Sequence, residues 1–227
     1  MISYARAGSQ RWLQVAIDRY PGALNGPLSQ MLGVAEHTIS WHCPLRSEGF
    51  CEYRDMEALR RLDVRRLPQR SLAAFWPRRG PVWDALGRTE RGDLLFVEAK
   101  AHIAEAASPP TQASPVSRHL IQKSLLEVRR SLAPNSEADW SRSFYQYANR
   151  LAHLYLFRQL NGLPAHLVWV YFLNARDVAG PTSVAEWKAA IALLHAALGL
   201  QVHTLEPYIH TVFINVAAFA EVEGNLG

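Results

Sequence analysis

Charged side chains follow one apolar run in this sequence, and their types and spacing suit metal-assisted chemistry. Glu98 and Lys100 come directly after Leu94–Val97, a continuous apolar segment typical of a central strand. Residues two apart on a strand share a face, so Glu98, Lys100 and His102 are expected to project together. A carboxylate and an ammonium at such a place are costly to bury unless they are paired or bind a metal ion.

A second carboxylate, Asp84, lies on the preceding segment. Pro81–Leu86 and Asp93–Ala101 are separated by turn-forming residues and are predicted to form a hairpin in which Asp84 lies opposite Glu98. Two converging carboxylates and the carbonyl of Ala99 provide the hard oxygen ligands that Mg²⁺ or Mn²⁺ prefers. The sequence therefore predicts a divalent-metal site, and a plain buried ion pair is the alternative that it leaves open.

Lys100 is expected to orient an attacking water or to stabilise developing negative charge. The chain has 24 Lys and Arg residues, of which only Lys100, Lys123 and Lys188 are lysines. A compact ammonium suits this role better than a planar guanidinium. The presence of lysine at this position therefore favours a chemical role.

These residues resemble the motifs of the PD-(D/E)XK nuclease superfamily. Asp84 matches the aspartate of the first motif, and residues 98–100 (Glu-Ala-Lys) match its E-x-K, although Trp83 stands where the motif name has proline. The order of predicted elements over residues 50–174 is also similar to that of the family. The resemblance implies a restriction-endonuclease-like α/β fold with a mixed central sheet. It also implies that the protein is an Mg²⁺- or Mn²⁺-dependent nuclease acting on DNA rather than RNA.

The resemblance also implies roles for particular residues. Asp84, Glu98 and Lys100 would be catalytic, and Asp84, Glu98 and the carbonyl of Ala99 would bind the metal ion. The family often supplies one more acidic ligand from the first core helix. The candidates in this chain are Glu48, Glu52, Asp55 and Glu57. Glu52 is preferred because it falls on the apolar side of a helix predicted over Glu52–Leu62.

A polar residue on the helix after the E-x-K is a further feature of the family. Gln146 resembles the family's glutamine, while Arg150 stands where exonuclease-type members have tyrosine. Gln146, Arg150 and His102 are predicted to contact phosphates of the substrate. A solvated helix face is the alternative interpretation of Gln146 and Arg150.

The rest of the sequence predicts an α/β domain with a mixed sheet. Helices are predicted over Arg11–Tyr20, Arg118–Leu132, Phe144–Leu160 and Val184–Leu198, in addition to Glu52–Leu62. Strands are predicted over Ser71–Trp76, Leu167–Leu173 and His210–Val216. Residues 105–115 contain three prolines and are predicted to form a loop of a length that is often functional.

Composition limits the class of protein. With 227 residues, 49% hydrophobic and 19% charged, the chain is expected to form one globular domain, which excludes disorder, collagen and coiled coil. We expect an N-terminal extension (1–49), a nuclease-like core (50–174) and a C-terminal helix and strand (175–227). Two cysteines are too few for a disulfide framework, and no apolar run has the length of a membrane helix. A cytoplasmic protein without a membrane partner is therefore expected, and its oligomeric state stays open.

Two further features bear on nucleic-acid binding. Residues 54–79 contain eight arginines against three acidic residues, which points to phosphate-bearing partners. Residues 28–43 resemble a helix-turn-helix unit, although Thr38–Trp41 alternates like a strand. A non-enzymatic DNA-binding protein that uses residues 28–43 is thus one alternative function. A catalytically silent interaction protein with the nuclease fold is another.

Overall fold

The protein is built on one mixed sheet of five strands. The computed structural model describes residues 2–219, and the strands lie in the order β1-β4-β5-β6-β7. These strands are β1 (Ile39–Cys43), β4 (Ala85–Thr89), β5 (Leu94–Lys100), β6 (Ala165–Leu173) and β7 (Ile209–Asn215). β4 is antiparallel to both β1 and β5, whereas β5, β6 and β7 are parallel. The chain is therefore an α/β protein with a mixed sheet, as predicted.

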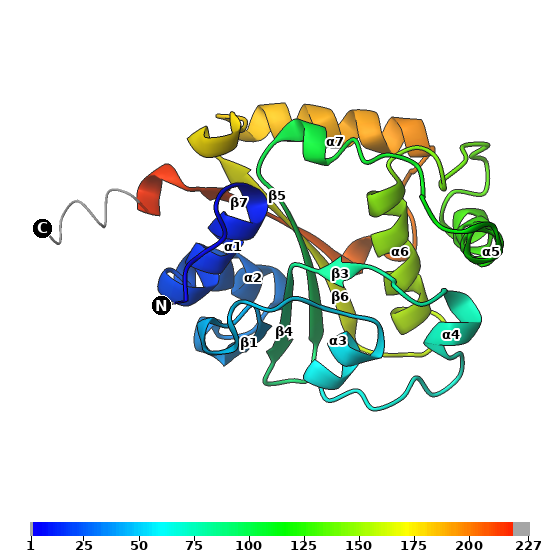
Figure 1. Cartoon of the computed structure of the whole chain (residues 1–227), viewed down its shortest axis with the longest axis horizontal. Coiled ribbons are helices and arrows are strands. Elements are labelled where there is room, and N and C mark those ends of the chain that lie inside the picture. The colour runs from blue at the N-terminus through cyan, green and yellow to red at the C-terminus, as the bar shows by residue number, and fades with distance from the viewer. Residues whose placement is uncertain (1, 220–227) are drawn as a thin grey trace, which may run out of the picture.

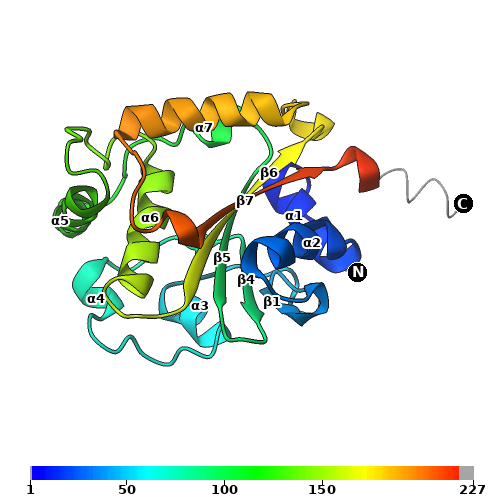
Figure 2. The same cartoon turned by 180° about the vertical axis from the view of Figure 1, so that it is seen from behind.

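Helices cover both faces of this sheet (Figures 1 and 2). On one face lie α1 (Gly8–Arg19) and α2 (Gly22–Leu32). The larger apolar cluster on the other face includes residues of α3 (Asp55–Arg61), α4 (Leu72–Phe75), α5 (Pro115–Leu132), α6 (Tyr145–Arg158) and α7 (Val184–Leu198). The central strands are thus buried on both sides, which explains their continuous apolar sequence.

Local sequence signals explain where α7 begins and ends. The Ser183 hydroxyl accepts a hydrogen bond from the Glu186 amide, and the Glu186 carboxylate accepts one from the Ser183 amide, which together form a capping box. Gly199 ends the helix in the left-handed conformation, with φ of 66°. The prediction of Val184–Leu198 is therefore confirmed at both ends.

One predicted strand is a helix. Residues 71–76 contain α4, because the Ser71 hydroxyl accepts a hydrogen bond from the Ala74 amide and Leu72 and Phe75 are both buried. The apolar residues that suggested a strand are spaced to place Leu72 and Phe75 on one side of a helical turn. The strand prediction for Ser71–Trp76 was therefore wrong.

The helix predicted over Glu52–Leu62 begins later than expected. Tyr53–Arg54 forms β2, which pairs antiparallel with β3 (Val82–Trp83) in a separate two-stranded sheet. The helix, α3, starts at Asp55. Glu52 therefore lies before the helix and is not on its apolar face. The pairing partner of β2 is distant in sequence, which is why local periodicity did not reveal the strand.

The helix-turn-helix interpretation of residues 28–43 is also wrong. α2 ends at Gly33, which has the left-handed φ of 64°, and it is followed by a single 3₁₀ turn at Glu36–Thr38. The would-be recognition helix is instead the strand β1, which places part of the expected extension 1–49 in the sheet. Residues 175–219 contribute α7 and β7.

Cys43 is buried and Cys51 is exposed, and both thiols are free. Between residues 2 and 219, every helix is too short or too polar to cross a lipid bilayer.

Candidate active site

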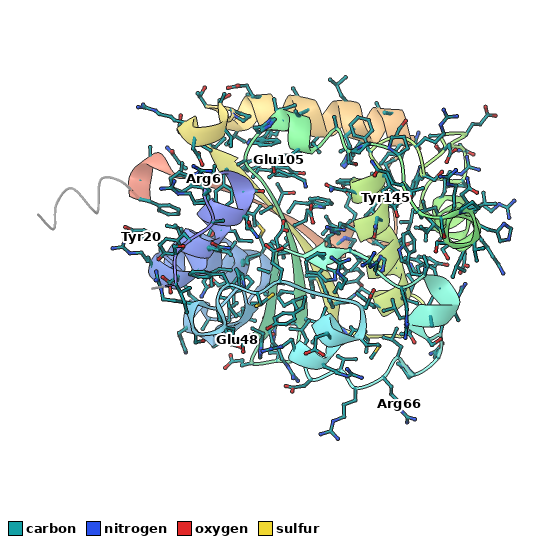
Figure 3. All side chains as sticks on the ribbon, viewed as in Figure 1. Arg6, Tyr20, Glu48, Arg66, Glu105 and Tyr145 are labelled. Carbon is teal, nitrogen blue, oxygen red and sulfur yellow. The ribbon has the colours of Figure 1, made fainter. Side chains whose placement is uncertain are left out.

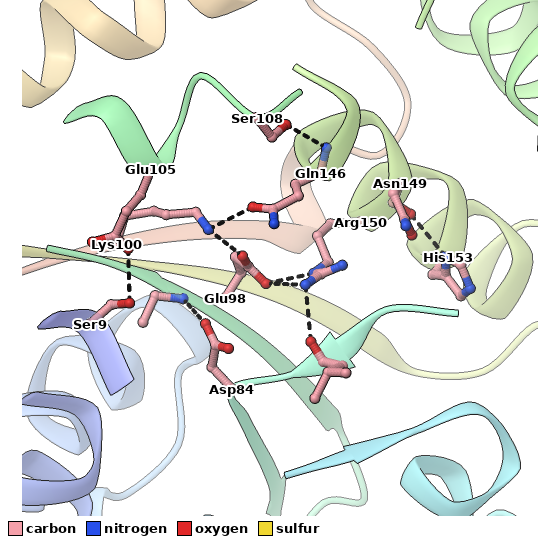
Figure 4. A network of polar contacts seen from close by, with 12 residues as sticks. Ser9, Asp84, Glu98, Lys100, Glu105, Ser108, Gln146, Asn149, Arg150 and His153 are labelled. Carbon is pink, nitrogen blue, oxygen red and sulfur yellow. Dashed lines mark hydrogen bonds and ion pairs between the residues drawn. The ribbon is translucent and has the colours of Figure 1, made fainter. Parts of the chain in front are cut away.

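The β4–β5 hairpin brings the two carboxylates together. Ala85 pairs with Val97 across the hairpin, so Asp84, one residue earlier, is a neighbour of Glu98. The Asp84 amide donates to the Val97 carbonyl at 3.1 Å, and the Asp84 Oδ2 atom accepts from the Ala99 amide at 2.7 Å (Figure 4). The backbone of β5 therefore fixes the Asp84 carboxylate, and the predicted juxtaposition of Asp84 with Glu98 is present.

Glu98 is held between two cations (Figure 4). Its Oε1 atom accepts a hydrogen bond from Lys100 Nζ at 2.6 Å, and its Oε2 atom accepts one from Arg150 Nε at 2.6 Å. Arg150 Nη2 forms a second contact with Oε2 at 2.5 Å and donates to the carbonyl of Val82 at 3.0 Å. The three side chains are almost fully buried, with Glu98 only 2% exposed, so this ionic network is shielded from solvent.

Lys100 connects the strand to helix α6. Its Nζ atom also donates to Gln146 Oε1 at 2.9 Å, and the backbone N–H of Gln146 donates to the Ser108 hydroxyl of the loop at 2.8 Å. Gln146 and Arg150 are one helical turn apart on α6, so both reach the same end of β5. The structure therefore places both predicted helix residues at the carboxylate pair.

Burial and neighbouring charges shift the pKa values of the two carboxylates in opposite directions. Burial raises the pKa of Asp84 well above its ordinary value, and the negative charge of Glu98 raises it further. Burial also opposes ionisation of Glu98, but the charges of Arg150 and Lys100 outweigh it and lower the Glu98 pKa. The neighbouring cations thus favour the ionised form of Glu98, whereas burial and the charge of Glu98 disfavour the ionised form of Asp84.

An open cleft of about 430 Å³ lies over this cluster. It is lined by Ser9, Pro81, Val82, Asp84, Glu98, Ala99, Lys100, Ser108, Pro109, Pro110, Gln112, Tyr145, Gln146, Asn149 and Arg150. One wall comes from residues 105–115, the proline-containing loop whose length is typical of functional loops, and another comes from α6. Both carboxylates and both cations line the cleft, although Glu98, Lys100 and Arg150 expose little of their surface to it.

Two predicted site residues lie outside the lining that the structure shows for this cleft. Glu52 accepts a hydrogen bond from Gln10 at 2.9 Å. Burial, and then the charge of Glu98, raises the pKa of Glu52, so it lies within electrostatic range of the cluster. His102 uses its Nδ1 atom to accept from the Ala104 amide at 3.0 Å, which begins a short 3₁₀ turn.

The sequence did not single out Asn149, although the structure places it in the cleft lining. Asn149 is 6% exposed, and its Oδ1 atom has no hydrogen-bond partner within residues 2–219. It lies three positions after Gln146 on α6, so helical spacing from Gln146 could have identified it. A buried acceptor without a partner is costly, which makes Asn149 a candidate for contact with a bound ligand.

Three of the eight arginines of residues 54–79, namely Arg60, Arg61 and Arg70, pair with carboxylates away from the cleft. Arg61 pairs with Glu48 at 2.6 Å, and Arg70 pairs with Glu127 at 2.7 Å. Arg66 extends away from the body of the protein (Figure 3). Within residues 2–219, none of the residues that line the cleft comes from 54–79. The positive charge that faces the carboxylates comes instead from Lys100 and Arg150.

The donor set fits a divalent cation that keeps part of its water shell. Within the described chain, no three His, Cys, Asp or Glu side chains are grouped to hold a metal ion. Mg²⁺, however, is commonly bound by one or two carboxylates together with waters and substrate phosphates. Asp84 uses only Oδ2 in its hydrogen bond to Ala99 and has an elevated pKa, so a cation beside it would supply the missing counter-charge.

The site combines two carboxylates and two buried cations near the end of a buried strand, and their residues line one cleft together with Asn149 of α6. Its chemistry must follow from these side chains. No protein-family model, curated protein or solved structure matches this chain.

Proposed function

We propose that this protein is a divalent-metal-dependent nuclease that hydrolyses phosphodiester bonds in DNA. The observation that carries the proposal is the convergence of Asp84, Glu98 and Lys100 at the end of β5, on the floor of an open cleft. Acidic oxygens next to an ammonium are the groups needed to bind a cation and to stabilise negative charge on a phosphate.

Asp84, Glu98 and the carbonyl of Ala99 would hold Mg²⁺ or Mn²⁺. The bound ion would neutralise charge on the scissile phosphate and make a coordinated water more acidic. Lys100 is fixed by Glu98 and Gln146, so its ammonium can stabilise the charge that develops on the phosphate without having to reorient. Arg150 and Asn149 line the cleft and are positioned to contact the sugar-phosphate backbone.

The topology supports a restriction-endonuclease-like fold for the same chain. The candidate residues lie on an antiparallel hairpin, β4–β5, and β6 follows in parallel after α6. The resemblance to the PD-(D/E)XK superfamily implies the order helix, three strands, helix and strand; the hairpin, α6 and β6 follow that order, whereas α4 stands in place of the first expected strand and α5 is an additional helix. Gln146 on α6 contacts Lys100, as expected for the polar residue that follows the E-x-K.

The test is a cleavage assay on linear and circular duplex DNA with Mg²⁺ or Mn²⁺. We expect Lys100→Met to lower the cleavage rate by about 10²- to 10⁴-fold, since it removes the charged group and keeps its apolar stem. Lys123→Met is the matched control, because Lys123 is exposed on α5 and undergoes the same chemical change. Equal cleavage by the wild type and Lys100→Met would show that the activity comes from a contaminant.

A catalytically silent DNA- or protein-binding role is the second candidate. The observation in its favour is that both oxygens of Glu98 already accept hydrogen bonds from buried cations. Such a protein would show no cleavage with any divalent cation and no metal binding. Asp84→Asn would then leave its DNA affinity unchanged.

A further inference from the structure

Arg150 occupies the carboxylate that the proposed metal ion needs. Its Nε and Nη2 atoms both contact Glu98 Oε2, at 2.6 and 2.5 Å, while Lys100 contacts Oε1. The guanidinium also lies 5.0 Å from the centre of the Trp83 ring, and Arg150 is 6% exposed. In the free protein, Glu98 is thus held by the planar guanidinium of Arg150, whose N–H donors can bind either a carboxylate or a phosphate.

The charges around Glu98 oppose the binding of either ligand alone. Asp84 and Glu98 supply two negative charges when both are ionised, and Lys100 and Arg150 supply two positive charges. A divalent cation alone would be placed beside two buried cations, and a phosphate alone beside two carboxylates. A bound phosphodiester, with its single negative charge, lowers the excess positive charge that the cation brings to the site, provided that Arg150 moves from Glu98 to the phosphate.

We propose that Arg150 is a positioning residue that couples metal binding to DNA binding. In the free protein it holds Glu98; when DNA enters the cleft it transfers to a backbone phosphate and leaves Glu98 Oε2 available to the cation. The inference rests on the proposed nuclease function and adds to it the order of assembly. The metal site is complete only when substrate is present.

The Arg150 guanidinium would move from Glu98 to a phosphate within one cleft. Arg150 and Glu98 both line it, so a phosphate bound in the cleft would lie beside the guanidinium that is proposed to receive it. Its hydrogen bond to the Val82 carbonyl at 3.0 Å keeps the group at the cleft edge. Asn149 lies next to it on α6 and lines the same cleft.

Coupling of this kind is reciprocal and can be measured from both sides. The factor by which DNA tightens Mn²⁺ binding must equal the factor by which Mn²⁺ tightens DNA binding. For the wild type we expect this factor to be at least about tenfold, within the usual range for coupled sites. Arg150→Met should bind Mn²⁺ alone at least about tenfold more tightly than the wild type, and its coupling factor should approach one.

The experiment measures free Mn²⁺ by electron paramagnetic resonance, with and without a duplex whose phosphodiesters are replaced by phosphorothioates. Anisotropy of the same labelled duplex, with and without Mn²⁺, gives the reciprocal factor. Arg130→Met is the matched control, because Arg130 is exposed on α5 and should behave as the wild type. Asp84→Asn should lose Mn²⁺ binding in every condition, which assigns the measured ion to this site.

Arg150→Lys keeps the experiment decisive if Arg150→Met fails to fold. Lysine retains the charge but not the two-pronged contact, so the coupling factor should fall between those of the wild type and the methionine variant. Equal Mn²⁺ affinity of the wild type with and without duplex would overturn the inference and leave the nuclease proposal standing. No Mn²⁺ binding by any variant, together with no cleavage, would instead contradict the proposed function.

Discussion

Over residues 97–100 the two faces of β5 have opposite chemistry, although Leu94 and Phe96, on the same face as Glu98 and Lys100, join the larger apolar cluster. Val97 and Ala99 point toward α1 and α2 and join an apolar cluster. Glu98 and Lys100 point to the opposite side, toward α6, where they meet Arg150 and Gln146. All seven residues of the strand are buried, so burial alone does not distinguish the two faces.

The difference separates residues that stabilise the fold from residues that the fold must accommodate. The apolar face gains free energy from each side chain that leaves water. On the charged face, the burial of four ionisable groups costs hydration free energy, and the ion pairs between them offset this cost only in part. Substitutions on the first face should therefore always destabilise, whereas on the second face the sign should depend on which charge is removed.

The largest effect is expected on the apolar face. Phe172 of β6 is fully buried in the cluster that α1 and α2 cover. Phe172→Ala should lower the free energy of unfolding by about 4 kcal/mol, through lost burial and the cavity left behind. Urea denaturation measures this change, and cleavage per folded molecule should stay unchanged.

Leu193→Ala is the control for Phe172→Ala. Leu193 lies on α7 with 71% of its surface exposed, so the same type of truncation should change stability by less than about 0.5 kcal/mol. A loss at Leu193 as large as that at Phe172 would contradict the assignment of the folding energy to the apolar face.

The contrast between the faces was largely predictable from sequence, because it follows from a two-residue period. The apolar run before Glu98 indicated a central strand, and the hairpin register placed Asp84 beside Glu98. These signals are local. The pairing of β2 with β3, by contrast, joins segments far apart in sequence. Because this pairing was not predicted, the helix α3 was predicted to start too early and Glu52 was wrongly placed on it.

The partnership of Arg150 with Glu98 shows where sequence reasoning stopped. Helical spacing placed Gln146 and Arg150 on one side of α6. It could not show that this side faces β5 or that the guanidinium binds the carboxylate itself, since both depend on how α6 packs on β6. Asn149 went unrecognised for the same reason, because its significance lies in an oxygen without a partner.

The second prediction concerns the ionised member of the pair. Glu98→Gln should destabilise the protein by about 3 kcal/mol at neutral pH, because it leaves Lys100 and Arg150 buried without a carboxylate. Chemical denaturation of the wild type and the variant at matched pH values measures the difference.

The pH dependence of this difference has a defined sign. The pKa of Glu98 is lowered below its ordinary value of 4.5 in the folded protein. Its stabilisation is therefore fully present above that pH and is lost as the pH falls through the folded value. The gap between wild type and Glu98→Gln should shrink in acid, and a gap that is constant with pH would contradict an electrostatic origin.

The smallest effect is expected to have the opposite sign. The pKa of Asp84 is raised above its ordinary value of 3.8, so the folded protein is penalised as the pH rises through the folded value. Asp84→Asn keeps an acceptor for the Ala99 amide but removes this charge. It should raise the free energy of unfolding at neutral pH by on the order of 1 kcal/mol, a gain that disappears in acid.

Asp93→Asn on the same hairpin is the matched control for Asp84→Asn. Asp93 accepts a hydrogen bond from the Thr89 hydroxyl at 2.8 Å and lies 3.5 Å from Arg91, so its substitution weakens favourable contacts and no gain is expected. If Asp84→Asn stabilises the protein and also abolishes metal binding and cleavage, the carboxylate is retained at the expense of the fold. A charge that only stabilised the structure could not give that result, because its removal would weaken the protein as it does at Glu98.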